Sequence, residues 1–415
     1  MLSTVKFAPM PEDGKLTLFS SESVTEGHPD KVCDQIADEI LDEIIRQEEG
    51  DPSLRCACEV MATAGTIVVA GEFTCRKMPD IDGIVRRVLS EIGYDSVAAG
   101  ADASTCNVIN LCHEKPYDTA SGENSDRTRY FDVPDDELDA LRPNDQSILF
   151  GYACDDTPSC MPLPIHVANM LAKALASARH SGRIPYLLPD GKTMATVAYD
   201  RDMRPVRIGR VLVSTQHEAG TDMGRLRHDI EELVVVPVLR SIGADLSSVR
   251  IDVNPGGNFS LGGPFVDTGC VGRKNIVDTY GGMGRNGGGA LSGKCMVKVD
   301  RIGAYLARRI AKHLVVAEVA RRCEIQIAYA PGLWEPFSVS VNTFGTGAIP
   351  DDAISDIVRK TFDFRSESII RELDLRRPIY RDTAAYGHFG RPFPWELIDD
   401  EIVAAIQSAA EACKA

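Results

Sequence analysis

The chain has 415 residues, of which 44% are hydrophobic, and its formal net charge is −16. This length predicts two or three domains with an ample core, and the composition is ordinary for a soluble globular protein. The negative charge argues against general nucleic-acid binding. The 12 cysteines contain no C-x-x-C pair, so we expect free thiols in a reducing cytoplasm.

The chain has no apolar run near the roughly 18 residues that a membrane helix needs. Residues 1 to 15 lack the apolar segment of a secretion signal, and they are expected to form a loose extension. We therefore expect a cytoplasmic protein with no membrane partner.

The first part of the chain alternates between strands and helices. The predicted elements are a strand, a helix, two strands, a helix and a strand, over residues 16–24, 29–47, 54–73, 80–92 and 106–112. His28 and Asp30 then lie at a helix N-terminus, where free N–H groups favour anions. Asp30 either stabilises the helix start or binds a metal. Glu59 and Glu72 lie in or beside apolar strands, either as edge-facing side chains or as ligands.

Residues 115–144 interrupt this pattern, because they are polar, contain several prolines and show little periodicity. A long segment of this kind in a compact enzyme is typical of either a lid or a disordered segment.

The rest of the chain again alternates. The predicted strands cover residues 145–154, 193–200, 211–216, 275–280, 325–330 and 337–343, and the predicted helices cover 164–178, 222–241, 298–316 and 353–362. A turn over 189–192 places Asp190 and Lys192 at a strand edge. An ordinary hairpin turn would show the same pattern. Strands give way to a helix three times, which hints at three similar α+β units.

The most unusual stretch runs from Asn254 to Lys298. Thirteen of the 35 glycines lie between Asn254 and Lys294, among several lysines and arginines. Glycine allows backbone N–H groups to approach a ligand closely, and a glycine-rich loop with lysine is a common holder of polyphosphate. The segment therefore suggests a nucleoside triphosphate site.

Two simpler interpretations of this stretch remain open. Gly288 to Lys294 matches G-x-x-x-x-G-K, but the next residue is Cys295 where a P-loop needs Ser or Thr. The alternative is a set of tight turns with solvated charges.

Several motifs together resemble S-adenosylmethionine synthetase. They are GHPDK at 27–31, GRKNIVDTYGG at 272–282, GGGALSGK at 287–294, KVDR at 298–301 and TAAYGHFGR at 383–391. The resemblance extends from about Leu16 to Trp395. It implies three intertwined, similar α+β domains with approximate threefold pseudo-symmetry, over 16–115, 145–251 and 252–397, with a mobile active-site loop over 116–144.

The resemblance also implies a reaction and its partners. Methionine and ATP would give S-adenosylmethionine by in-line attack of the sulfur on ribose C5′, and the triphosphate would be hydrolysed to pyrophosphate and phosphate. The family implies a homodimer, or a dimer of dimers, with active sites between subunits. It implies Mg²⁺, two ions per site, and K⁺. The alternatives are a triphosphate-hydrolysing enzyme and a catalytically weak regulatory subunit.

The site residues are carried over motif by motif. Positions assigned to ATP are His28, Asp190, Lys192, Phe259, Asp267, Arg273, Lys274, Ala290 and Lys294, and those assigned to catalysis are His28, Lys192, Arg273 and Lys294. Positions assigned to methionine are Glu72, Glu114, Asp267 and Lys298. Magnesium is assigned to Asp30 and Asp300, and potassium to Glu59. We further infer that Asp145 favours the cationic sulfonium product.

Some positions depart from the family pattern. The usual GAGDQG hexapeptide is RPNDQS here, from Arg142 to Ser147, which predicts a stiffer loop hinge and altered ATP contacts. Glu114 stands where the family usually has glutamine, so the amino-acid preference could differ. Asn286 replaces a histidine and Cys295 an acid.

Overall fold

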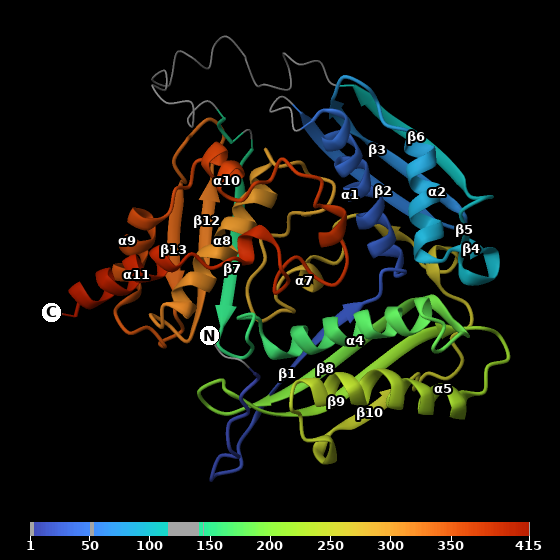
Figure 1. Ribbon diagram of the computed structural model, residues 1–415, viewed down its shortest axis with the longest axis horizontal. Coiled ribbons are helices and arrows are strands. Elements are labelled where there is room, and N and C mark those ends of the chain that lie inside the picture. The colour runs from blue at the N-terminus through green and yellow to red at the C-terminus, as the bar shows by residue number, and fades with distance from the viewer. Residues whose placement is uncertain (1–3, 50–53, 115–140, 144, 415) are drawn as a thin grey trace.

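The computed structural model describes residues 4–49, 54–114, 141–143 and 145–414. Three lobes surround the centre of the molecule, and each is a sheet covered by helices (Figure 1). The predicted mobile loop over 116–144 lies mostly outside the described residues.

The lower lobe in Figure 1 contains a four-stranded sheet with the order β1-β8-β9-β10. Its strands are β1 (Thr17–Val24), β8 (Leu187–Tyr199), β9 (Pro205–His217) and β10 (Arg250–Val253). Only β9 and β10 run parallel. Its helices are α4 (Leu163–His180), which packs on β1 and β8, α5 (Met223–Ile230), a π-helical turn (Glu231–Val235) and α6 (Val236–Ser241).

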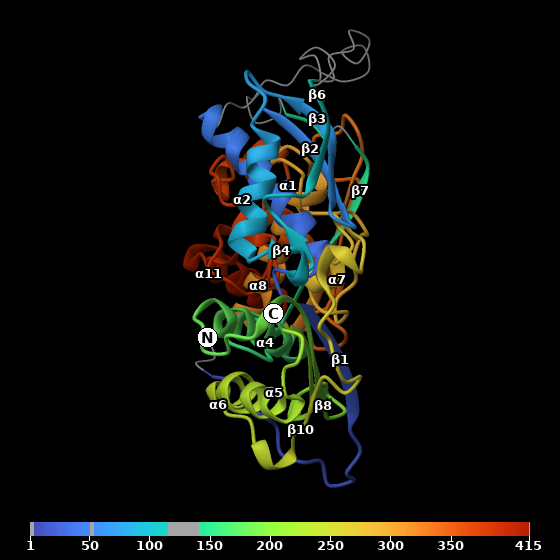
Figure 2. The ribbon, with the colours of Figure 1, turned by 90° about the vertical axis from the view of Figure 1, so that its right-hand side faces the viewer.

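The upper right lobe contains the sheet β11-β2-β3-β6. Its strands are β2 (Arg55–Thr63), β3 (Thr66–Thr74), β6 (Asn107–Glu114) and β11 (Gly269–Cys270). Helices α1 (Pro29–Gln47) and α2 (Ile81–Ile92) lie to one side of this sheet, as Figure 2 shows. The two-stranded sheet of β4 (Asp95–Ser96) and β5 (Ala101–Asp102) completes the lobe.

The left lobe contains the antiparallel sheet β13-β12-β7. Its strands are β7 (Ser147–Cys154), β12 (Arg322–Tyr329) and β13 (Ser338–Asn342). Its helices are α8 (Val299–Val316), α9 (Asp351–Thr361), α10 (Ser366–Glu372) and α11 (Asp400–Ala412). The short helix α7 (Asn275–Asp278) lies near the centre of the molecule. Single 3₁₀ turns cover Val97–Ala99, Leu246–Ser248, Gly263–Phe265, Arg381–Thr383 and Pro394–Glu396.

The three lobes exchange strands, so the chain is intertwined. β1 comes from the start of the chain but joins β8, whereas β11 comes from the glycine-rich stretch but joins β2. β7 precedes α4 and β8 of the lower lobe in sequence but pairs with β12 of the left lobe. The predicted α+β class with three intertwined units is confirmed. The ranges 16–115, 145–251 and 252–397 remain a proposed division of the chain.

The hydrophobic core follows the same arrangement. One apolar cluster joins α1, β2 and α2 to β7, α8 and β12, and a second lies between α4, α5 and the strands β8 and β9. α8 is buried along almost its whole length at the centre of the first cluster. The upper right and left lobes therefore share one core, which fixes α1 against the glycine-rich stretch.

Three predicted elements were wrong in detail. Residues 275–280 form α7 and a turn rather than a strand, because the buried Asp278 turns inward to pair with Lys31. Residues 189–192 belong to β8, and the register shift between Leu187 and Gly191 accommodates Pro189, which has no N–H to donate. The helix predicted over 222–241 is interrupted by the π-helical turn beside Pro237, which likewise has no N–H to donate. α10 and α11 had no predicted counterpart.

Candidate active site

The N-terminus of α1 presents His28, whose proton position is set by the backbone. His28 is the N-cap residue, and its Nδ1 accepts a 3.2 Å hydrogen bond from the Asp30 N–H. Burial, with the neighbouring Lys274 and Lys192 ammonium groups, lowers the pKa of His28 to about 3. The ring is therefore neutral at physiological pH, and its remaining proton lies on Nε2, where it is free to donate.

Asp30 follows His28 and binds the glycine-rich stretch. Its Oδ1 accepts a 3.0 Å bond from the Cys270 N–H, and its Oδ2 lies 2.5 Å from Lys274 Nζ. Arg273 is 3.8 Å from Oδ1. Burial favours the neutral acid, but the bonds from Lys274 and Cys270 hold the pKa of Asp30 below its ordinary value, so it is a carboxylate.

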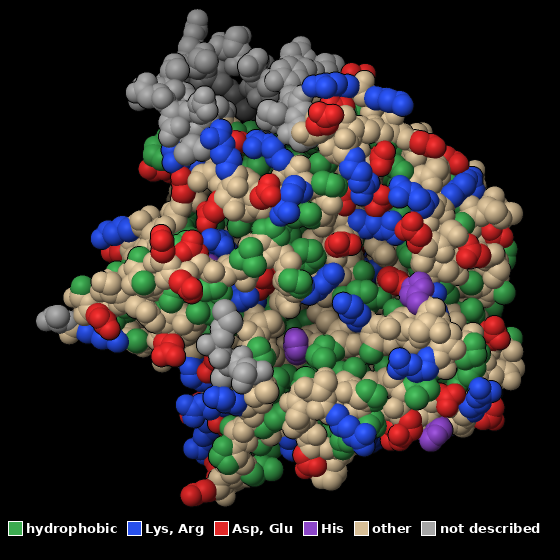
Figure 3. Space-filling model, viewed as in Figure 1, with side chains coloured by type: hydrophobic (Ala, Val, Ile, Leu, Met, Phe, Trp, Pro, Cys, Tyr) green, Lys and Arg blue, Asp and Glu red, His purple; other side chains and the backbone are tan. Residues whose placement is uncertain are grey.

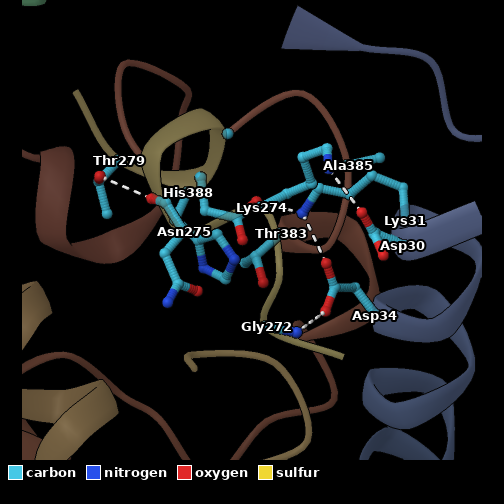
Figure 4. Close-up of polar contacts among 12 residues, drawn as sticks. Asp30, Lys31, Asp34, Gly272, Lys274, Asn275, Thr279, Thr383, Ala385 and His388 are labelled. Carbon is cyan, nitrogen blue, oxygen red and sulfur yellow. Dashed lines mark hydrogen bonds and ion pairs between the residues drawn. The ribbon is translucent and has the colours of Figure 1, made fainter. Parts of the chain in front are cut away.

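Further carboxylates follow Asp30 at every fourth position along α1. Asp34 accepts from the Gly272 N–H at 2.9 Å, and Asp38 accepts from the Gly293 N–H at 2.8 Å. Figure 4 shows Asp30 and Asp34 one turn apart and facing the loop that carries Gly272 and Lys274. Because i and i+4 residues share a helix face, this row of carboxylates fixes the glycine-rich stretch along α1.

Asp300 lies in the first turn of α8 and has the same kind of surroundings as Asp30. Its Oδ1 accepts a 2.6 Å bond from Ser147 Oγ, and its Oδ2 lies 2.8 Å from Lys294 Nζ. A Cβ on Gly289 would lie 2.8 Å from Asp300 Oδ1, so the glycine run can pass this carboxylate only without a side chain. Asp300 and Lys294 remain partly accessible, at 19% and 23%.

The two halves of the glycine-rich stretch touch each other. Gly272 has φ 73°, and a Cβ there would meet the Ala290 Cβ at 2.4 Å. Asn275 Nδ2 donates to the Gly288 carbonyl at 3.0 Å. The turn with Arg273 and Lys274 is thus packed against the run that ends at Lys294.

β8 carries the next two predicted residues. Asp190 is 6% exposed, and its Oδ2 accepts from the Gly263 N–H at 3.0 Å. Its Oδ1 has no partner among the described residues, and burial raises the pKa of Asp190 to about 6. A buried oxygen without a partner is costly, which fits a ligand that donates to it. Lys192 acts electrostatically on both Asp190 and His28.

Phe259 is positioned by a histidine that the sequence analysis did not identify. His217 Nε2 accepts from the Phe259 N–H at 3.1 Å, and the His217 N–H donates to the Phe259 carbonyl at the same distance. His217 is 1% exposed. The half-buried ring of Phe259 is therefore attached to the end of β9.

Other predicted residues lie around this centre. Glu59, Glu72 and Glu114 are exposed on β2, β3 and the end of β6. Although the Glu59 side chain reaches solvent, partial desolvation by its neighbours raises its pKa, and Lys294 opposes that rise. Lys298 is the N-cap of α8, and Asp267 is exposed after the Gly263–Phe265 turn.

The described structure brings several of the predicted ATP-binding and metal-binding residues together, whereas Asp145, predicted to favour the sulfonium product, has no contact with them among the described residues. His28, Asp30, Lys192 and Lys274 interact with one another. Asp145 is exposed, and its carboxylate accepts only a local bond from the Gln146 N–H among the described contacts.

The sequence analysis missed Asp34, Asp38 and Ser147. The signal for the first two was present, since Asp30, Asp34, Asp38 and Asp42 recur at i+4 within an otherwise apolar helix face. Such a row of buried carboxylates predicts partners from elsewhere in the chain. Ser147 has no comparable signal.

The donor chemistry suits magnesium bound jointly by protein and phosphate. Among the described residues, no group of three or more His, Cys, Asp or Glu could hold a metal. Magnesium prefers oxygen ligands and often takes one or two carboxylates together with substrate phosphates. Asp30 and Asp300 fit that pattern, since each is a single carboxylate beside the glycine-rich stretch.

A search of the described helices found none long and apolar enough to cross a membrane. On the face drawn in Figure 3, acidic and basic side chains are interspersed rather than gathered into one basic stripe.

The chain is similar to known proteins along most of its length. Models of the N-terminal, central and C-terminal domains of S-adenosylmethionine synthetase match residues 16–116, 141–259 and 261–397. An S-adenosylmethionine synthase of Desulforudis audaxviator is 48% identical over 385 residues, which cover 92% of this chain and 96% of that protein.

Proposed function

The chain belongs to the S-adenosylmethionine synthetase family, and we propose that it is a methionine adenosyltransferase that makes S-adenosylmethionine from L-methionine and ATP. One observation carries the proposal at the level of the site. Lys274 and Lys294 of one glycine-rich stretch pair with the carboxylates Asp30 and Asp300, and the neutral His28 lies beside Asp30, where Lys274 and Lys192 act on it electrostatically. This is a suitable environment for a triphosphate leaving group.

The methionine sulfur is an uncharged nucleophile, so its attack on ribose C5′ needs no general base. The chain's contribution is to position the reactants and to stabilise the charge that develops on the departing triphosphate. His28 donates from Nε2 to the oxygen leaving C5′. Lys192, Arg273 and Lys294 stabilise the phosphate oxygens, and hydrolysis to pyrophosphate and phosphate follows in the same place.

The adenine and ribose end of ATP lies toward β8 and β9 in this proposal. Phe259, held by His217, supplies an aromatic surface for the base. Asp190 accepts a hydrogen bond through its unpartnered Oδ1. Asp267, Lys274 and Ala290 complete the nucleotide contacts.

Asp30 and Asp300 would hold two magnesium ions, and Glu59 would hold potassium. When bound, these ions neutralise part of the triphosphate charge.

Methionine is held by Glu72, Glu114, Asp267 and Lys298. Carboxylates suit its ammonium group and the lysine suits its carboxylate. Asp145 favours the sulfonium product by charge. Glu114 stands in place of the usual glutamine. At this position the preference for the amino-acid substrate is most easily changed relative to that of the family.

The protein acts as a homodimer or a dimer of dimers, with sites between subunits. The outer face of the sheet β11-β2-β3-β6 supports this, because Met61, Ile109 and Leu111 are exposed there beside Glu59 and Glu72. An exposed apolar sheet face is typical of an interface. We propose a cytoplasmic location, with no nucleic-acid or membrane partner.

Purified protein alone tests the proposal. With ATP, methionine, magnesium and potassium, it should form S-adenosylmethionine, detected through a coupled methyltransferase. Phosphate release without that product would favour a triphosphate hydrolase. Neither product from a folded protein would favour a regulatory subunit.

A further inference from the structure

Asp30 and Asp300 lie on different helices and share two kinds of contact, although Arg273 also lies 3.8 Å from Asp30 Oδ1. In each, Oδ1 accepts from a neutral donor, the Cys270 N–H at 3.0 Å or the Ser147 hydroxyl at 2.6 Å. In each, Oδ2 is covered by a lysine, Lys274 at 2.5 Å or Lys294 at 2.8 Å. The neutral donor orients the carboxylate, and the lysine occupies the oxygen that a metal would use.

We propose that Lys274 and Lys294 are exchangeable counter-ions, each of which covers a metal-binding carboxylate until metal and triphosphate arrive together and then moves to the phosphates. This rests on the proposed function, since it assumes that Asp30 and Asp300 bind a divalent cation. It adds a second role to lysines that are otherwise assigned only to ATP.

The chemistry of the pairs suits exchange. An ammonium on a flexible four-carbon stem makes a point contact and can turn to a new partner without moving the backbone. Lys274 and Lys294 are 17% and 23% exposed, so neither is enclosed. The buried Arg301 differs, because it grips both oxygens of Asp38 at 2.7 and 2.9 Å and is fully enclosed.

The exchange keeps each charge compensated at every stage. Before binding, each lysine neutralises its carboxylate. After exchange, the divalent cation neutralises the carboxylate and the lysine neutralises phosphate oxygen. A cation arriving alone must displace a lysine that has no phosphate to receive it, so metal alone binds weakly.

Metal and triphosphate must therefore bind with positive coupling, and the coupling is reciprocal. A metal also binds triphosphate directly, which couples the two without any lysine. The part that depends on the lysine is isolated by measuring metal affinity in the absence of phosphate.

The test is a titration of the full chain with Mn²⁺, followed by the loss of the free-ion electron paramagnetic resonance signal, without nucleotide. We expect Lys274→Met and Lys294→Met each to raise Mn²⁺ affinity about three- to tenfold, because an uncovered carboxylate becomes available. The same variants should bind inorganic tripolyphosphate at least about fivefold more weakly by calorimetry.

Lys192→Met is the matched control. Its ammonium also lies near His28, but among the described residues it forms no ion pair with a carboxylate. This variant should weaken tripolyphosphate binding and leave Mn²⁺ affinity within about twofold of the wild-type value, as expected for an exposed charge.

Two results would overturn the exchange. One is unchanged Mn²⁺ affinity in both folded variants, and the other is an equal rise in Lys192→Met, which would be a general effect of charge. Because the two pairs are separate, misfolding of one variant leaves the other as a test. If the wild-type protein makes S-adenosylmethionine but neither lysine variant gains Mn²⁺ affinity, the proposed function stands and the lysine exchange is refuted.

Discussion

Aspartates in the first turn of α1 and aspartates further along the helix have different kinds of partner. Near the N-terminus, Asp30 pairs with a lysine that solvent still reaches. Two turns later, Asp38 pairs with Arg301 through two bonds, and both side chains are fully enclosed. At the far end, Asp42 accepts from the Tyr380 and Arg381 N–H groups.

Asp30 is a carboxylate that can change its partner, whereas Asp38 is one that cannot. A single ammonium contact near solvent costs little to break. A bidentate arginine pair without solvent is costly to break, because the remaining charge would be buried alone. We infer that the first turn of α1 serves the ligand and that the later turns attach the glycine-rich stretch and the C-terminal segment.

The largest expected effect comes from breaking the enclosed end. Asp38→Ala should lower the free energy of unfolding by about 3–5 kcal/mol, because Arg301 and the Gly293 N–H lose their buried acceptor. Urea unfolding measures this value. Glu43→Ala on the same helix, which removes a partly exposed partner of Arg46, should cost less than about 1 kcal/mol. Equal losses in the two variants would contradict the comparison.

Changes at the ligand end should act on catalysis instead. Lys294→Ala and Asp30→Asn should each lower kcat at least about 100-fold while the protein stays folded, because the first removes a cation from the leaving triphosphate and the second removes a carboxylate proposed to hold magnesium there. Product formation and the thermal midpoint are measured together. Lys173→Ala, an exposed lysine on α4, is the control and should keep its activity. Wild-type turnover in either site variant would refute the role of that residue.

The pH dependence of protein stability should reveal the titration of Asp42. Burial raises the pKa of Asp42 to about 7, above its unfolded value near 4. Folding therefore favours the protonated form, so the contribution of Asp42 is fully present below about pH 4 and declines up to about pH 7. Asp42→Asn removes this titration.

The unfolding free energy of Asp42→Asn relative to wild type should therefore rise by roughly 1–4 kcal/mol between pH 4 and 7. Urea unfolding at several pH values measures it. A constant difference across that range would show that Asp42 keeps an ordinary pKa.

The smallest expected effect is at Ser147. Ser147→Ala removes the neutral donor from Asp300 Oδ1, so the carboxylate is oriented less well. Magnesium should then be needed at about two- to tenfold higher concentration for half-maximal activity, as for one lost hydrogen bond. Ser147→Thr keeps the hydroxyl and should resemble wild type. A similar loss in Ser147→Thr would point to packing instead.

Local pattern was sufficient for much of the fold. α1 was predicted with the observed bounds, because the apolar i+4 repeat and Pro29 at the first position are local signals. Residues 275–280 were predicted wrongly, because Asp278 is turned inward by Lys31, which is distant in sequence. Long-range partners override local strand propensity in such segments.

The site residues were predicted from sequence motifs. The residues that were not predicted have roles that depend on partners distant in sequence. The i+4 row Asp34, Asp38 and Asp42 indicates buried partners, but the sequence does not indicate which distant loops donate to these carboxylates. The sequence indicates Ser147 only as part of an altered loop hinge, whereas its hydroxyl contacts Asp300. The strand exchange between lobes likewise has no local signal.

In the proposed reaction, cationic side chains gather around the triphosphate of ATP. A crystal structure with magnesium, methionine and a non-hydrolysable ATP analogue tests it most directly. We expect phosphate oxygens within hydrogen-bond distance of Lys294, Arg273 and His28, with a metal on Asp30 or Asp300. Phosphates bound away from these three residues would contradict it.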